Sequence, residues 1–194
     1  MKTVVHSSIF VLERDDMLVF KKKVSDNQLA NVFLNGVLDV VELGFPEIAS
    51  LINDDPAFVQ SPNIGPENSD QFAVIILVAN LSSLENTFEV QQASRIEAII
   101  FEKLAVIMQA TPGEVENTVR EYQKFLSRVN HPSKNMIYAI SKAIFHKYEL
   151  NAYQDEYFKR LHAPNPLFLK RMDQVVDQFL WDWDAFFKKY RIEE

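Results

Sequence analysis

Apolar residues recur at intervals of three and four over the last hundred residues, the spacing that places side chains on one face of an α-helix. The stripe Ala93, Ile96, Ile100, Leu104 and Ile107 is one example. The pattern predicts helices over 91–110, 112–130 and 133–148, a short helix after Asn151 and a long one after Asn165-Pro166. The fold class is therefore predicted as mainly α, a multi-helix array of about seven helices.

Helix start and stop signals locate several of these boundaries. The segments 25–28 and 111–114 each carry the pattern of a capping box, with Ser or Thr at the N-cap and Gln or Glu three residues on. We therefore expect one helix to begin after residue 25 and another after residue 111. Gly44 predicts the end of the first helix, and a short helix is expected to begin at Pro46.

Two regions carry strand-like patterns. The β-prone runs 9–12 and 17–20 flank a short polar stretch, which predicts a small N-terminal β-hairpin. The run 72–79 is uninterrupted and apolar, and it suits a buried strand as well as a buried helix. We favour a helix there because the following segments are helical. The alternative is an α+β fold with a small sheet that includes 72–79.

The domain organisation follows from a long polar segment. Residues 53–70 are mostly Asn, Asp, Pro, Ser and Gly, which predicts a loop. We expect a single domain over 1–194, in which this loop separates an N-terminal subdomain 1–52 from a helical part 71–194. Loops of this length are uncommon in compact domains and often carry function.

Composition excludes several classes of site. The chain has no cysteine, which excludes disulfides, thiolate metal sites and a cysteine nucleophile. Its four glycines form neither a dinucleotide-binding loop nor a P-loop. No apolar run approaches the length of about 20 residues that a membrane-spanning helix needs. We expect a cytoplasmic protein without a cofactor, and we interpret the glycosylation pattern Asn80-Leu81-Ser82 as chance.

Charge is distributed unevenly along the chain. The formal net charge is −7, and no lysine, arginine or histidine occurs between Lys23 and Arg95. Ten acids lie in that stretch, and the candidate partner-binding residues among them are Asp39, Glu42, Asp54 and Asp55. Such a surface favours a basic protein partner over a nucleic acid or a membrane. The alternative is a solubilising face without a partner.

The histidines offer only a weak candidate for chemistry. His146 and Glu149 are three residues apart near a helix end, so their side chains share a face and could supply two metal ligands. The Glu-x-x-His pattern of di-iron bundles and the His-Glu-x-x-His pattern of zinc proteases are both absent. We therefore assign no catalytic residue and no metal site. The alternative interpretation of His146 is a histidine that interacts with its own helix end.

The segment 179–190 is the most aromatic of the chain. If it is one continuous helix, Trp181 falls on the polar side beside Asp177, Asp184 and Lys188, and should be at least partly exposed. An exposed tryptophan beside charges is typical of an interface hot spot. Alternatively, the connection 164–168 folds over it.

These observations predict a non-enzymatic, cytosolic protein-interaction module of the adaptor, inhibitor or immunity type. Its acidic N-terminal half and Trp181 are the expected contact surfaces for a protein partner. The alternative is a small ligand- or metal-binding helical enzyme with a pocket near His146 and Glu149. The oligomeric state is left open, and self-association is compatible with the sequence.

Overall fold

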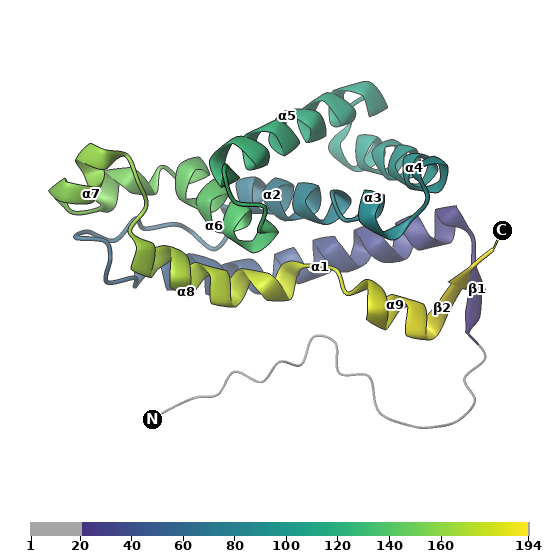
Figure 1. Cartoon of the computed structure of the whole chain (residues 1–194), viewed down its shortest axis with the longest axis horizontal. Helices are drawn as coiled ribbons and strands as arrows, with labels where there is room; N and C mark the ends of the chain where they lie inside the picture. The colour runs from purple at the N-terminus through teal and green to yellow at the C-terminus, as the bar shows by residue number, and fades with distance from the viewer. Residues whose placement is uncertain (1–20, 194) are drawn as a thin grey trace.

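The computed structural model describes residues 21–193, which form a mostly helical array with a small two-stranded sheet (Figure 1). In chain order the elements are β1 (Lys22–Val24), α1 (Asp26–Asn53), α2 (Asp70–Leu81), α3 (Leu84–Thr87), α4 (Val90–Met108), α5 (Pro112–Asn130), α6 (Met136–Lys147), the 3₁₀ helix η1 (Leu150–Tyr153), α7 (Glu156–Leu161), α8 (Pro166–Val176), the 3₁₀ helix η2 (Asp177–Phe179), α9 (Trp183–Lys189) and β2 (Tyr190–Ile192). The prediction of a mainly α array with a small sheet is confirmed.

Helix α2 lies at the centre of the array. It packs against α1 on one side and against α5 and α6 on the other (Figure 1). Its residues from Ile75 to Leu81 are all buried, so the helix is covered on every side. This explains why the run 72–79 lacks a polar face and reads equally well as a buried strand. The helix prediction for 72–79 is confirmed, and the alternative sheet that includes these residues is wrong.

Both predicted capping boxes are present. The side chain of Ser25 accepts a hydrogen bond from the Gln28 amide, and the Gln28 side chain accepts one from the Ser25 amide. Thr111 and Glu114 make the same reciprocal pair at the start of α5. Helix α6 begins at Met136, three residues after the predicted start at residue 133, and Asn135 is its N-cap.

The predicted interruption of the first helix is wrong. Helix α1 continues through Gly44 and Pro46 to Asn53. A proline inside a helix removes one backbone hydrogen bond at a cost of about 3 kcal/mol. Burial of Phe45, Ile48 and Ile52 on the inner face of the same helix offsets that cost. Gly44 is not a helix stop but a contact point, because the ring of Phe179 lies directly over it.

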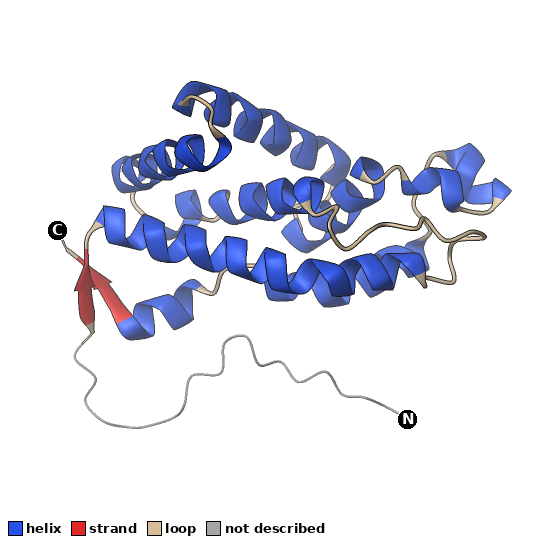
Figure 2. Ribbon diagram, turned by 180° about the vertical axis from the view of Figure 1, so that it is seen from behind, coloured by secondary structure: helices blue, strands red, loops and turns tan. Residues whose placement is uncertain are grey.

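The small sheet joins the two ends of the described chain. Strand β1 pairs in parallel with β2, with Lys22 opposite Tyr190 and Val24 opposite Ile192 (Figure 2). The apolar runs 9–12 and 17–20 of the predicted hairpin lie outside the described residues. A pairing between segments so distant in sequence has no local turn signal, and sequence patterns did not indicate it.

The long C-terminal helix predicted after Asn165-Pro166 is also wrong in its second half. Helix α8 ends at Val176, η2 adds one turn, and Leu180 is extended, with φ −83° and ψ 135°. The chain then restarts as α9 at Trp183. The break turns Trp181 and Trp183 toward α1, where Phe33 contacts both rings.

The segment between α1 and α2 is a loop, as predicted, and side chains hold it in place. Asn53 accepts a hydrogen bond from the Ile64 amide at 2.7 Å and donates one to the Ile64 carbonyl at 2.9 Å. Phe58 is buried and forms an isolated bridge with Gln154. Within residues 21–193, no helix combines the length and apolar character needed to cross a bilayer.

The contact at Gly44 gives a test of the continuous α1. A methyl group on Gly44 would lie 2.6 Å from two ring atoms of Phe179, which is 2% exposed and cannot easily move aside. We expect Gly44→Ala to lower the free energy of unfolding by about 1–2 kcal/mol, although alanine favours helices over glycine. Gly113→Ala in α5 is the control, since no atom lies within 4 Å of the new methyl group. Chemical denaturation of both variants measures the effect, and a Gly44→Ala protein as stable as the parent would contradict the contact.

Candidate interaction surface

The outer face of α1 carries a row of acids around an exposed leucine. Asp39, Glu42, Leu43 and Glu47 are all exposed, and their spacing places them on one side of the helix. We call these four residues the acidic strip. Leu43 is 73% exposed. In Figure 2, α1 is the long helix that crosses the middle of the view, and no other helix lies in front of it.

The acids of this strip form no ion pair with any residue that the structure describes. In the part of the chain that the structure describes, ion pairs near α1 occur only at its two ends. Arg95 pairs with Asp26 at the first turn, and Arg171 pairs with Asp55 just beyond the last turn. Among residues 21–193, no ion pair includes Asp39, Glu42 or Glu47, and all three side chains are exposed.

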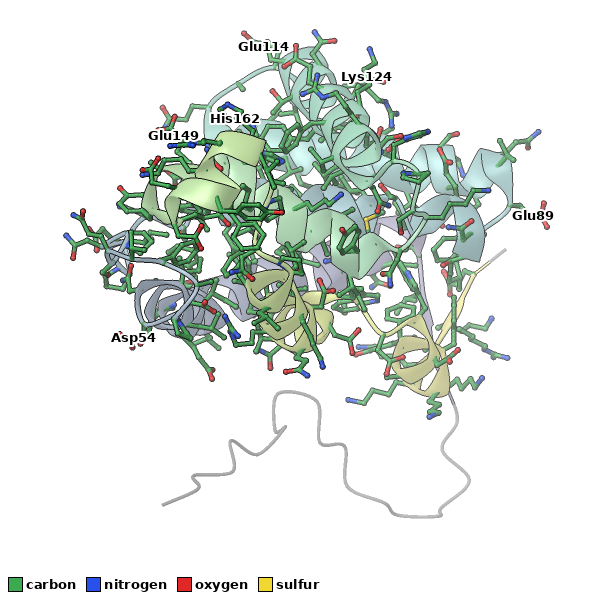
Figure 3. All side chains as sticks on the ribbon, turned by 60° about the vertical axis from the view of Figure 1, so that its left-hand side comes forward. Asp54, Glu89, Glu114, Lys124, Glu149 and His162 are labelled. Carbon is green, nitrogen blue, oxygen red and sulfur yellow. The ribbon has the colours of Figure 1, made fainter. Side chains whose placement is uncertain are left out.

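The two other predicted acidic residues lie in different environments. Asp54 is exposed at the C-cap of α1 and accepts a hydrogen bond from Ser50 at 3.3 Å; Figure 3 shows it at the lower edge of the molecule. Asp55 is only 5% exposed and accepts two hydrogen bonds from Arg171, at 2.7 and 2.5 Å. These bonds raise the pKa of Arg171 above its ordinary value. Asp55 therefore anchors the loop onto α8, and the prediction that it belongs to an exposed acidic face is wrong.

Trp181 is partly exposed, as predicted, but a contact with α1 holds it rather than the connection 164–168. Its ring lies against Gly36, where a methyl group would come within 2.5 Å of it. The ring also packs edge-on against Phe33, with 5.4 Å between the centroids. Glycine at position 36 is thus what lets an indole approach the helix backbone.

The backbone around Trp181 is held by a buried amide. The Asn80 side chain is 1% exposed; it donates to the Phe179 carbonyl at 2.9 Å and accepts from the Trp181 amide at 2.7 Å. These are the backbone groups on either side of Leu180, where the helical hydrogen bonds stop. Asn80 therefore satisfies both groups that the break exposes. Its burial also agrees with our interpretation of the glycosylation pattern as chance.

Trp181 contributes to the lining of two hollows. One has a volume of about 130 Å³, and its lining includes Val32, Trp181, Phe186 and Tyr190. We call it the Trp181 hollow. The other, of about 200 Å³, lies toward α2 and α6 and is lined in part by Ser83. Trp181 thus lines two hollows at the surface and is partly exposed, so side chains of a partner can contact it.

His146 and Glu149 lie near the end of α6, at residues that differ in backbone geometry and surroundings. The described residues contain no group of three or more histidines and carboxylates placed to hold a metal ion. Glu149 lies beyond the end of α6 with a left-handed backbone, φ 53°. His146 faces Arg128 and Lys142, and partial burial together with these two charges lowers its pKa. A cationic neighbourhood disfavours a bound cation.

Sequence reasoning missed a surface of cations over aromatic rings on α5 and α6. Lys147 Nζ lies 4.1 Å from the Tyr122 ring centroid, and Lys142 Nζ lies 4.5 Å from the centroid of Tyr138. We call the surface the basic aromatic surface, and its members are Tyr122, Phe125, Arg128, Tyr138, Lys142, His146 and Lys147. Tyr138 and Lys142 are four residues apart on one helix, a spacing from which their contact could have been predicted.

No family model, no curated protein and no solved structure matches this chain. The assignment of a function therefore depends on the surfaces themselves.

The role of Asn80 in placing Trp181 can be tested by replacing the amide with an apolar side chain of similar size. Asn80→Leu removes the hydrogen bonds that the Asn80 side chain makes with the Phe179 carbonyl and the Trp181 amide. We expect a loss of about 2–4 kcal/mol in the free energy of unfolding, because each unsatisfied group costs about 1–3 kcal/mol. Asn117→Leu on the exposed face of α5 makes the same change without burial and serves as the control. Denaturant titration measures both, and equal stability of the two variants would refute the role.

Proposed function

We propose that this chain is a non-catalytic, cytosolic protein-interaction module and that the acidic strip binds a basic partner. The observation that carries the proposal is Leu43, a leucine 73% exposed among acids that no described cation neutralises. An apolar side chain surrounded by charge is the arrangement of a protein interface, with an apolar centre and a polar rim.

The rigidity of α1 supports this proposal. The inner face of the helix is fully buried against α2, α4 and η2, with Phe33, Phe45 and Ile52 at 0% exposure. A surface on such a helix is already in its binding conformation, so association loses little conformational entropy. Acids held at fixed positions also steer a basic partner toward one orientation, an effect that salt weakens.

The Trp181 hollow extends the same surface. Val32 lines it, and Val32 and Asp39 are two turns apart on α1, which corresponds to about 10 Å along the helix. A partner that crosses the acidic strip can therefore place an apolar side chain against Trp181. Large aromatic residues at partly exposed positions are typical anchors of binding energy. Trp181 is thus proposed as a second contact point.

Adaptors, inhibitors and immunity proteins all fit this description, because each acts by occupying a surface of another protein. The common chemical requirement is a partner with lysine or arginine around an apolar position. The strip and the Trp181 hollow do not distinguish between these three roles.

The experiment is capture from native lysate by immobilised protein at about 50 mM and about 500 mM salt. The unmodified protein is compared with Asp39→Lys/Glu42→Lys, and we expect capture of a basic protein to fall about tenfold in the variant and at high salt. Trp181→Ala tests the second contact point.

The matched control is Glu89→Lys/Glu102→Lys, which makes the same change of charge at two exposed positions, the N-cap of α4 and a residue within it. It should retain capture, and thermal unfolding establishes that both variants are folded. Capture that survives reversal of the strip, or that no variant and no salt concentration alters, would overturn the proposal.

A further inference from the structure

The basic aromatic surface lies apart from the acidic strip. Helix α2 packs against α1 and against α5 and α6, and so stands between the two surfaces. In Figure 3, Lys124 of α5 projects from the upper part of the molecule and Asp54, at the end of α1, from the lower part. The proposed function does not use α5 and α6, so their cations call for a separate explanation.

Aromatic rings, not carboxylates, hold these cations. Lys147 lies over two rings of α5, at 4.1 Å from the centroid of Tyr122 and 5.0 Å from that of Phe125. The guanidinium of Arg128 lies 5.5 Å from the centroid of Phe125, and Lys142 lies over Tyr138. Cation–π contacts restrict the positions of these charges and leave them positive.

Other cations of the same region are neutralised within the chain. Arg120, two turns before Arg128 on α5, forms hydrogen-bonded ion pairs with Glu97 and Glu116. Among the ion pairs of residues 21–193, none includes Arg128, Lys142 or Lys147. The surface therefore presents three positioned and unneutralised charges on a chain whose net charge is −7.

The pKa of His146 responds to the positive charge of this surface. The charged groups that face it are Arg128 from α5 and Lys142 from its own helix, and its ring meets Phe125 edge-on at 6.5 Å. Its lowered pKa has three causes: burial first, then Lys142, then Arg128. An anionic group placed among these residues would reverse the last two contributions and raise the pKa of His146.

We infer that the basic aromatic surface binds an acidic segment of a partner protein. Three cations held on two adjacent helices can each pair with a carboxylate of such a segment, and the partly buried rings beside them offer apolar contact. A single-stranded nucleic acid fits less well because base binding needs free ring faces for stacking. Here Lys147 covers Tyr122 and Phe125, and Lys142 covers Tyr138.

The test uses a fluorescent peptide in which glutamates alternate with leucine and phenylalanine, and follows its anisotropy as the full chain is added. We expect saturable binding at low salt that weakens about tenfold in Lys142→Gln/Lys147→Gln. Lys188→Gln/Lys189→Gln, which removes two exposed charges from α9, should change affinity less than about twofold. The same peptide with glutamine in place of glutamate should not bind.

A second readout follows His146 itself by NMR during pH titration. Bound acidic peptide should raise the pKa of His146 toward or above its ordinary value, whereas a peptide bound elsewhere would leave the pKa unchanged. Thermal unfolding establishes that the glutamine variants are folded, and their loss of binding then reflects the removed charges.

Three outcomes would overturn the inference. One is equal affinity for the peptide in the two double variants. Another is tighter binding of a single-stranded oligonucleotide than of the peptide, which would assign the surface to nucleic acid. The third is self-association at low salt that Asp39→Lys/Glu42→Lys abolishes, which would make a second copy of this chain the occupant. This last outcome would also remove the need for a foreign basic partner, whereas the first two leave the proposed function untouched.

Discussion

The side chain of Asn80 joins the centre of the fold to its C-terminal segment. It lies in the otherwise apolar wall of α2 and hydrogen-bonds the two backbone groups that flank Leu180. Because those groups are satisfied, the chain can leave helical geometry inside the protein and turn two tryptophans onto α1. Gly36 and Gly44 complete the arrangement by giving the rings of Trp181 and Phe179 room against the helix. The packing of the C-terminal segment therefore depends on the side-chain amide of Asn80 and on the glycines at positions 36 and 44.

Local interactions made much of this fold predictable. The capping boxes at Ser25 and Thr111 join residues three positions apart, and both could be read from the sequence. The same reasoning wrongly predicted a helix end at Gly44 and a continuous helix through Leu180. Contacts with residues distant in sequence determine the backbone at both positions. A glycine that ends helices in isolation is retained inside α1 because an aromatic ring lies over it. Tertiary packing overrides a local signal wherever burial contributes more than propensity.

The residues of the candidate surfaces also differ in whether local sequence could predict their environment. The exposure of Asp39 and Glu42 followed from the charge pattern, whereas Asp55 looked identical in sequence and proved to be buried against Arg171. Its partner lies more than a hundred residues along the chain, so no local pattern could separate the two cases. The contact of Lys147 with Tyr122 likewise exists only because α5 and α6 are adjacent. The acidic strip and the basic aromatic surface lie on opposite sides of the apolar helix α2. The two sides of the protein therefore carry opposite charges.

The pairing of β1 with β2 has a consequence for the order of folding. These strands join nearly the first described residues to nearly the last, so their hydrogen bonds close almost the largest loop that the described chain allows. The entropy lost in closing a loop increases with its length, and such a contact stabilises a chain only after the intervening helices have shortened the distance between its ends. We therefore expect β1 and β2 to pair last during folding and to separate first during unfolding. Exchange of the Glu193 amide proton, which donates to the Val24 carbonyl at 2.9 Å, would follow local opening at this corner rather than the global unfolding of the helices.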